Sequence, residues 1–147
     1  MKLSINLNKV ALLRNSRGED YPNIEHFANK AIDLGVDGLT LHPRPDHRHA
    51  TSKDVINLAK LSKERGVEFN IEGNPFSKPN KDFLGFCELV ELTNPDQITL
   101  VPDEINQITS DASVMDSIQA FKSIFLCLMS ENPLKLHDEL RKLEKLS

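Results

Sequence analysis

Three histidines and two arginines lie close together in residues 42–49, where they are separated by two prolines and one aspartate. An imidazole can transfer protons near neutral pH, and a guanidinium offers a planar fork of donors that pairs two phosphate oxygens at once. The apolar run just before this segment, residues 36–41, is typical of a buried strand, and the prolines exclude a helix after it. We therefore expect a loop at the carboxyl end of a strand that binds an anion and transfers protons.

Polar side chains also follow the other apolar runs, which lie at residues 3–7, 67–71 and 97–101. Arginines among them suit phosphate recognition, whereas His42 and Glu72 suit proton transfer because burial can tune their pKa values toward neutral pH. The alternative is that these loop charges are merely solvated. The candidates at the ends of the four runs or after them are Asn6, Asn8, Lys9, Arg14, Asn15, Arg17, His42, Arg44, His49, Asn70, Glu72, Thr109 and Ser110.

A zinc site, as in a zinc-dependent hydrolase, is a second interpretation of the histidine cluster. Its ligands would be His42, His47 and His49, with an oxygen from Asp46 or Glu72. The neighbouring arginines would repel a dication, so this interpretation is disfavoured.

Strand-like apolar runs alternate with helical patterns in residues 1–111. This alternation predicts parallel strands joined by helices, with the site at the carboxyl ends of the strands. One helix is expected over residues 24–32, with Asn23 as its N-cap and Gly35 as its stop. A second opens at Thr51 or Ser52 with a capping box and closes at Gly66, and a third starts near Pro79.

The pattern changes after Asp111. Two helical patterns follow, at residues 118–128 and 136–143, and no fifth strand is evident. A closed barrel of eight strands and helices takes about 250 residues, so the 147 residues of this chain suit only part of one. We predict an α/β protein with a half TIM barrel over residues 1–111 and a helical tail over residues 112–147.

The bulk properties favour a small anionic ligand over a macromolecular one. The net charge is −4, so the basic residues at 44–49 are a local concentration in an acidic protein and a nucleic-acid surface is not expected. No stretch approaches the roughly 20 apolar residues of a membrane helix, and the first residues do not read as a signal peptide. We expect a cytoplasmic protein without a membrane or nucleic-acid partner.

Four segments, residues 4–18, 38–49, 69–73 and 99–103, closely resemble the pyridoxine 5′-phosphate synthase family, in order and at matching spacing. The resemblance covers roughly residues 1–111. It implies a (β/α)8 barrel that forms homo-oligomers. It also implies condensation of 1-deoxy-D-xylulose 5-phosphate with 3-amino-2-oxopropyl phosphate in vitamin B6 biosynthesis, without a metal or organic cofactor.

The resemblance assigns roles to individual residues. His42 and Glu72 would be proton acceptors, and Asn6 and Arg17 would bind the amino-ketone phosphate. The deoxyxylulose phosphate would be bound by Arg44, His49 and Thr109, helped by Asn8 and Lys9. Many family members have Asp-His where this chain has Asn8 and Lys9, a change expected to keep polar contact but not proton transfer.

The sequence after Asp111 departs from the family pattern. The later strands of the family supply a histidine proton donor and glycine-rich phosphate loops, and nothing in the tail is expected to replace them. His137 lies in a leucine-rich helical pattern without a glycine turn. We therefore expect a truncated synthase that is weakly active or inactive alone. The alternative is a non-catalytic half-barrel that binds phosphate metabolites or oligomerises with a partner.

Overall fold

The computed structural model describes residues 2–18 and 20–101 of the chain. The chain divides into two compact units. The first comprises residues 1–73 and 77–99 and contains the elements that position the candidate site. Of the second, residues 74–76 and 100–147, the structure describes 74–76, 100 and 101. Thr109 and the predicted helical tail lie outside the described residues.

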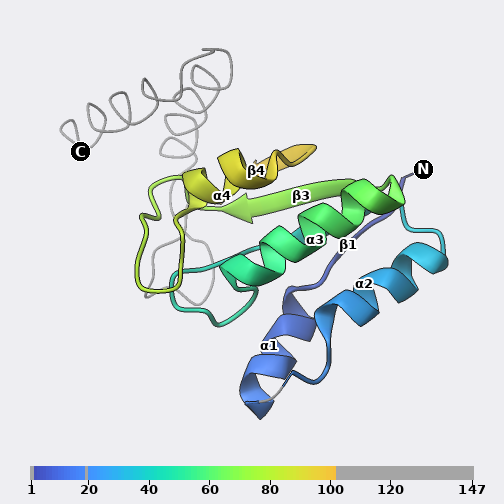
Figure 1. Cartoon of the computed structure of the whole chain (residues 1–147), viewed down its shortest axis with the longest axis horizontal. Coiled ribbons are helices and arrows are strands. Elements are labelled where there is room, and N and C mark those ends of the chain that lie inside the picture. Colours follow the sequence, from blue (N-terminus) through green and yellow to red (C-terminus); the bar gives the residue numbers. More distant parts are fainter. Residues whose placement is uncertain (1, 19, 102–147) are drawn as a thin grey trace. The chain divides into compact units, whose positions relative to one another are not determined.

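Four strands form one sheet in the order in which they occur along the chain (Figure 1). They are β1 (Ser4–Asn6), β2 (Gly38–Leu41), β3 (Glu68–Gly73) and β4 (Gln97–Leu100). The first two pairs are parallel, with Asn6 opposite Thr40 and Thr40 opposite Asn70. This confirms the predicted α/β fold with parallel strands, and in the described residues the sheet is open, as expected of a partial barrel.

The connecting helices are α1 (Asn8–Arg17), α2 (Ile24–Asp33), α3 (Ser52–Arg65) and α4 (Phe86–Thr93). The predicted N-cap of α2 is confirmed, because Asn23 Oδ1 accepts a hydrogen bond of 2.8 Å from the backbone N–H of His26. The capping box of α3 is confirmed as well, between Thr51 and Asp54. Among the described residues, no helix is long and apolar enough to cross a membrane.

Two features of the helices differ from the prediction. Helix α1 was not expected, because Leu12 and Leu13 lie on its exposed side and leave no apolar stripe; only Asn8 and Ala11 of this helix are buried. The third predicted helix begins at Phe86, not near Pro79. Residues before it form a tight antiparallel bridge between Asn80 and Phe83, whose backbone groups exchange two hydrogen bonds of 2.9 Å.

Side chains alternate between the two faces of the sheet. Leu39, Leu41, Phe69 and Ile71 are at most 2% exposed and form the core with the helices. The intervening positions carry a row of hydrogen-bonded polar side chains, which we call the polar ladder: Ser4, Thr40, Asn70 and Thr99. Its successive contacts measure 3.1, 3.4 and 3.1 Å, and it crosses all four strands. One face of the sheet is therefore apolar and covered, and the other is polar.

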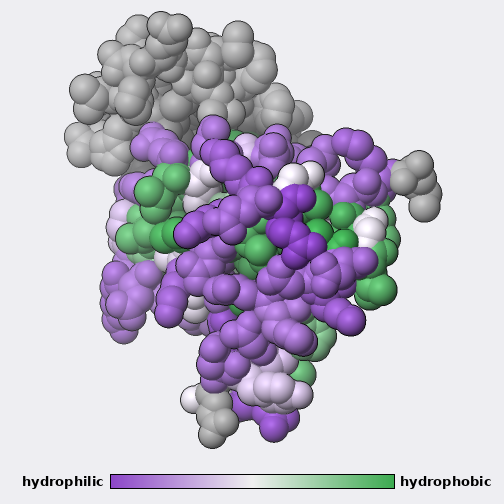
Figure 2. Space-filling view, turned by 45° about the vertical axis from the view of Figure 1, so that its right-hand side comes forward, coloured by the Kyte–Doolittle hydropathy of each residue, from purple (hydrophilic) through white to green (hydrophobic). Residues whose placement is uncertain are grey.

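The surface of the described part is mostly hydrophilic in the view of Figure 2, with hydrophobic side chains showing in smaller areas between. This agrees with a chain in which 27% of the residues are charged.

Candidate active site at the carboxyl ends of the strands

The ends of β1 and β3 are joined by a side-chain hydrogen bond, although β2 lies between these strands. Asn6, the last residue of β1, donates from Nδ2 to Oε2 of Glu72 over 3.2 Å. Glu72 is the penultimate residue of β3 and is half-buried. Two residues predicted from separate strand ends are thus brought into direct contact.

His42 follows β2 directly and is held through its main chain. Its backbone N–H donates to Asn8 Oδ1 over 2.8 Å, and the backbone N–H of Asn8 donates to Asn6 Oδ1 over 2.9 Å. Asn8 is only 8% exposed, so its side-chain oxygen is committed to the end of β2. Either an aspartate or an asparagine oxygen can accept this N–H, which gives a physical reason why Asn8 is tolerated here.

The pKa of the Glu72 carboxyl group is shifted by its surroundings. Burial raises the pKa of Glu72 above its usual range, while the charge of His42 and the hydrogen bond from Asn6 oppose that rise. A carboxylate that is partly desolvated yet held by a donor is a suitable proton acceptor near neutral pH.

The loop between β2 and α3 carries the basic candidates Arg44 and His49. It is closed by a bridge between Pro43 and Ala50, and the backbone N–H of His47 donates to the carbonyl of Arg44 over 2.9 Å. Arg44 is 5% exposed, with Nε 3.8 Å from Oδ2 of Asp46. The same oxygen lies 2.6 Å from Nε of Arg48. The cluster is therefore a compact cationic loop with one internal carboxylate.

His49 lies beside His42, with 6.2 Å between the ring centroids. Burial lowers the pKa of His49, and the positive charges of His42, Arg44 and Arg48 lower it further, against the opposing effect of Asp46. Its Nδ1 atom is buried and has no hydrogen-bond partner among the described residues. A neutral imidazole with an unused nitrogen, next to a buried guanidinium, suits recognition of a phosphate ester.

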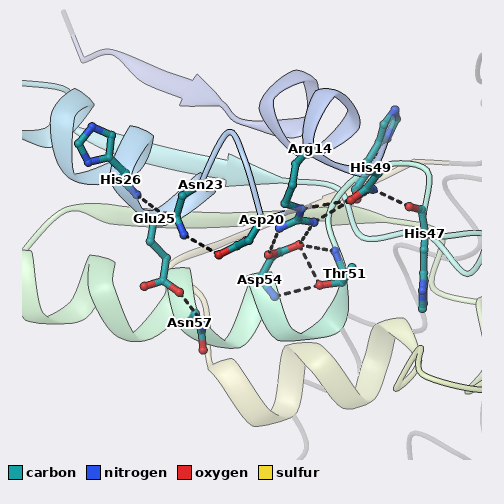
Figure 3. A network of polar contacts seen from close by, with 11 residues as sticks. Arg14, Asp20, Asn23, Glu25, His26, His47, His49, Thr51, Asp54 and Asn57 are labelled. Carbon is teal, nitrogen blue, oxygen red and sulfur yellow. Dashed lines mark hydrogen bonds and ion pairs between the residues drawn. The ribbon is translucent and has the colours of Figure 1, made fainter. Parts of the chain in front are cut away.

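Arg14 has a different role from the one expected. Its two terminal nitrogens contact the carboxylate oxygens of Asp54 at 2.6 and 2.8 Å, and both side chains are nearly buried (Figure 3). Arg14 is therefore committed to a structural pair that joins α1 to α3 and is not available as a phosphate ligand. The sequence concealed this pair because its members are 40 residues apart.

Arg17 and Lys9 are exposed on α1, and in the described part of the chain neither forms a hydrogen bond or an ion pair with Glu72. Arg17 is the last residue of this ten-residue helix, about 13 Å along its axis from Asn8. Its guanidinium lies over the ring of Tyr21, 5.5 Å from the centroid. The ligand roles of both residues stay predictions.

The zinc interpretation finds no support in the described residues. Within residues 2–18 and 20–101, no three His, Cys, Asp or Glu side chains are grouped so that they could hold a metal ion.

Sequence reasoning missed Ser4, Thr40 and Thr99 of the polar ladder. Polar residues at every second position, such as Thr40 before His42 and Asn70 before Glu72, were the signal that could have revealed it.

Parallel strands in chain order, helical connections and a polar cluster at the carboxyl ends of the strands define a protein of the (β/α)-barrel class. The model of one family, "Pyridoxal phosphate biosynthesis protein PdxJ", matches residues 3–129. The chain belongs to this family. The match continues past Asp111, where the resemblance was expected to end; the predicted division into a half-barrel and a tail stays a prediction.

Curated relatives named pyridoxine 5′-phosphate synthase support the same assignment. That of Xylella fastidiosa (strain 9a5c) is 54% identical over 110 residues, which cover 75% of this chain and 42% of the relative. That of Xanthomonas axonopodis pv. citri (strain 306) is 52% identical over 110 residues, with 75% and 43% covered. That of Xanthomonas oryzae pv. oryzae (strain MAFF 311018) is 46% identical over 133 residues, with 84% and 52% covered. The chain spans about half the length of the curated relatives it matches.

Proposed function

We propose that this chain carries part of a pyridoxine 5′-phosphate synthase site and binds the phosphorylated substrates of that reaction. The observation that carries the proposal is the joined cluster of Asn6, His42 and Glu72 at three neighbouring strand ends, beside the cationic loop. In the proposed reaction, 1-deoxy-D-xylulose 5-phosphate and 3-amino-2-oxopropyl phosphate condense to the pyridine ring of vitamin B6 with release of inorganic phosphate and water.

Each group has a chemical task in this proposal. Glu72 accepts protons from the condensing substrates, since its raised pKa brings it toward the working pH. His42 is the second proton acceptor. Asn6 orients the Glu72 carboxylate and contacts the amino-ketone phosphate, with Arg17 as a further ligand of that substrate.

The cationic loop binds the deoxyxylulose phosphate in this proposal. Arg44 supplies charge from a buried position, where its attraction for an anion is less screened than at the surface. His49 supplies a neutral donor or acceptor. Asn8, Lys9 and Thr109 complete the proposed ligand set. The homo-oligomer and the cytoplasmic location expected from the sequence also stay predictions.

Calorimetric titration of the chain with deoxyxylulose phosphate tests the proposal. Arg44→Ala should weaken binding by about tenfold or more, because a charge-assisted hydrogen bond contributes about 1.5–3 kcal/mol. Arg65→Ala is the matched control, since it removes the same charge from an exposed pair with Asp33 on the helical side. Added salt should weaken binding to the unmodified chain. Submillimolar affinity that Arg44→Ala leaves unchanged would contradict the assignment.

A further inference from the structure

The side chain of Asn15 connects α1 to the middle of the cationic loop. Its Nδ2 group donates to the backbone carbonyl of His47 over 2.8 Å and to that of His49 over 2.7 Å. A side-chain amide has two N–H donors, and here both are used on one loop. Figure 3 shows the loop end of this connection at His47 and His49, beside the contacts of Arg14.

The side-chain oxygen of Asn15 is held by Arg14, the residue before it in α1. Oδ1 of Asn15 accepts hydrogen bonds from Nε and a terminal nitrogen of Arg14, over 3.2 and 3.0 Å. Arg14 pairs with Asp54, and Asp54 forms the capping box of α3 with Thr51, the residue that directly follows the loop. Asn15 is therefore held by the structure that anchors the end of the loop.

The loop depends on such an external contact. Pro43 and Pro45 have no backbone N–H to donate, and His47 adopts a φ of 53°, which is uncommon for a residue other than glycine. Without the Asn15 side chain, the backbone carbonyls of His47 and His49 would each lose a hydrogen bond. Because Asn15 fixes the backbone carbonyl of His49, it also fixes the point from which the His49 side chain extends.

We propose that Asn15 is a positioning residue of the site. By fixing the main-chain carbonyls of His47 and His49, it holds the imidazole of His49 in the arrangement that receives a phosphate ester beside Arg44, whose backbone carbonyl accepts the N–H of His47. The identity of that ester rests on the proposed function above, whereas the positioning of the loop does not.

Asn15→Ala in the 147-residue chain tests the proposal, and Asn29→Ala is a closely matched control. Asn29 donates to the carbonyl of Glu25 over 3.0 Å and accepts from Arg65 over 2.7 Å, and Arg65 pairs with Asp33 at 2.6 Å. The control therefore removes contacts of the same kinds, to a backbone carbonyl and to an arginine that is paired with an aspartate, and none of these groups belongs to the loop. Urea unfolding of both variants separates loss of folding from loss of positioning.

Two measurements follow the variants. Binding of deoxyxylulose phosphate and of inorganic phosphate should weaken by about tenfold in Asn15→Ala and should change little in Asn29→Ala. Tenfold is the lower end of the loss seen where a partner that orients a metal-ligating side chain is removed. The pKa of His49, followed by NMR of its ring, should rise toward its ordinary value in Asn15→Ala only, because the released loop exposes the ring to water. A purely structural role in α1 would move neither quantity beyond the control.

A third measurement needs no variant and covers the case in which Asn15→Ala does not fold. In the unmodified chain, the side-chain N–H groups of Asn15 should exchange with solvent more slowly than those of Asn29, and phosphate should shift only the former. Equal exchange and equal shifts would overturn the proposal, as would an unchanged His49 pKa in a folded Asn15→Ala variant. If the unmodified chain binds neither phosphate nor its ester, the proposed function fails, and the His49 titration and the exchange rates still decide the positioning role.

Discussion

Asn6 Nδ2 lies 3.2 Å from Glu72 Oε2, so the ends of β1 and β3 are linked across the end of the strand that separates them. The amide that donates to Glu72 also accepts the backbone N–H of Asn8 through its oxygen. Asn6 can therefore orient the carboxylate only while the start of α1 keeps its place. The orientation of the Glu72 carboxylate therefore depends on the main chain at the start of α1.

The first prediction concerns this contact. Asn6→Ala should raise the pKa of Glu72 further, because it removes a donor that favours the charged carboxylate while burial, the larger effect, remains. Carbon-detected NMR of the glutamate carboxyl groups measures the change. Asn57→Ala is the control, since Asn57 donates to Glu25 over 2.6 Å on the exposed side and should leave Glu72 unaffected. A lower or unchanged Glu72 pKa in Asn6→Ala would contradict the prediction.

The second prediction concerns the pair of Arg14 and Asp54. Asp54→Ala should lower the free energy of unfolding by about 3 kcal/mol, because it leaves a nearly buried guanidinium without its partner and removes the capping box of α3. Asp33→Ala breaks a pair of the same length whose side chains are 36% and 58% exposed, and should cost less than about 1 kcal/mol. Urea unfolding of both variants measures the difference. Equal losses in the free energy of unfolding would show that the buried pair stabilises the fold no more than the exposed pair does.

The third prediction is the pH dependence of that pair. Burial alone would raise the pKa of Asp54, but hydrogen bonds from Arg14 and Thr51 together hold it below its usual range. The unfolded chain therefore binds this proton at a higher pH than the folded chain does. The stabilisation is complete above the unfolded pKa of about 4 and is lost as the pH falls through the folded pKa. The stability difference between the unmodified chain and Asp54→Ala should accordingly shrink in acid, and a difference that grows there would refute the assignment.

The fourth prediction concerns His49. Burial and the neighbouring positive charges lower its pKa, so the folded chain resists protonation that the unfolded chain accepts near pH 6.5. Stability should therefore be complete above this pH and decline as the pH falls through the folded pKa. His49→Gln should flatten that part of the profile in urea unfolding at a series of pH values. An imidazole resonance of His49 that titrates above the ordinary value would rule this out.

The fifth prediction is that the 147-residue chain turns over the two phosphorylated substrates far more slowly than a full-length synthase. The chain spans 42–52% of the relatives' length, and loss of a positioned acid or base typically costs about 10²- to 10⁴-fold in rate. Product formation followed by mass spectrometry measures the rate. Turnover comparable to that of a full-length synthase, abolished by Glu72→Gln, would contradict the prediction.

The sequence was informative where the signal is local. Residue types within a few positions predict the N-cap Asn23, the capping box at Thr51, and the places of Asn6 and Glu72 near the carboxyl ends of strands. Each is found as expected. Helix α1 could not be recognised in the same way, because its leucines face outward instead of forming a buried stripe.

Contacts between distant residues were not accessible from one sequence. The pairing of Arg14 with Asp54, and the contact of Asn15 with the loop more than 30 residues away, depend on where α1 lies in space. The charge of Arg14 suggested a ligand only because its partner was unknown. Which arginine can bind phosphate therefore depends on the tertiary structure, because that structure determines which arginines are paired with a carboxylate.

The polar ladder also determines how the strands align. Because side chains alternate, sliding β3 by one residue would turn Asn70 and Glu72 toward the helices and bring Phe69 and Ile71 onto the polar face. Such a slip would lose the hydrogen bonds to Thr40 and Thr99 and expose two residues of the core. The ladder therefore makes one register of β3 far more favourable than a register shifted by one residue. The position of Glu72 at the carboxyl ends of the strands is a consequence of this strand pairing and does not require a bound substrate.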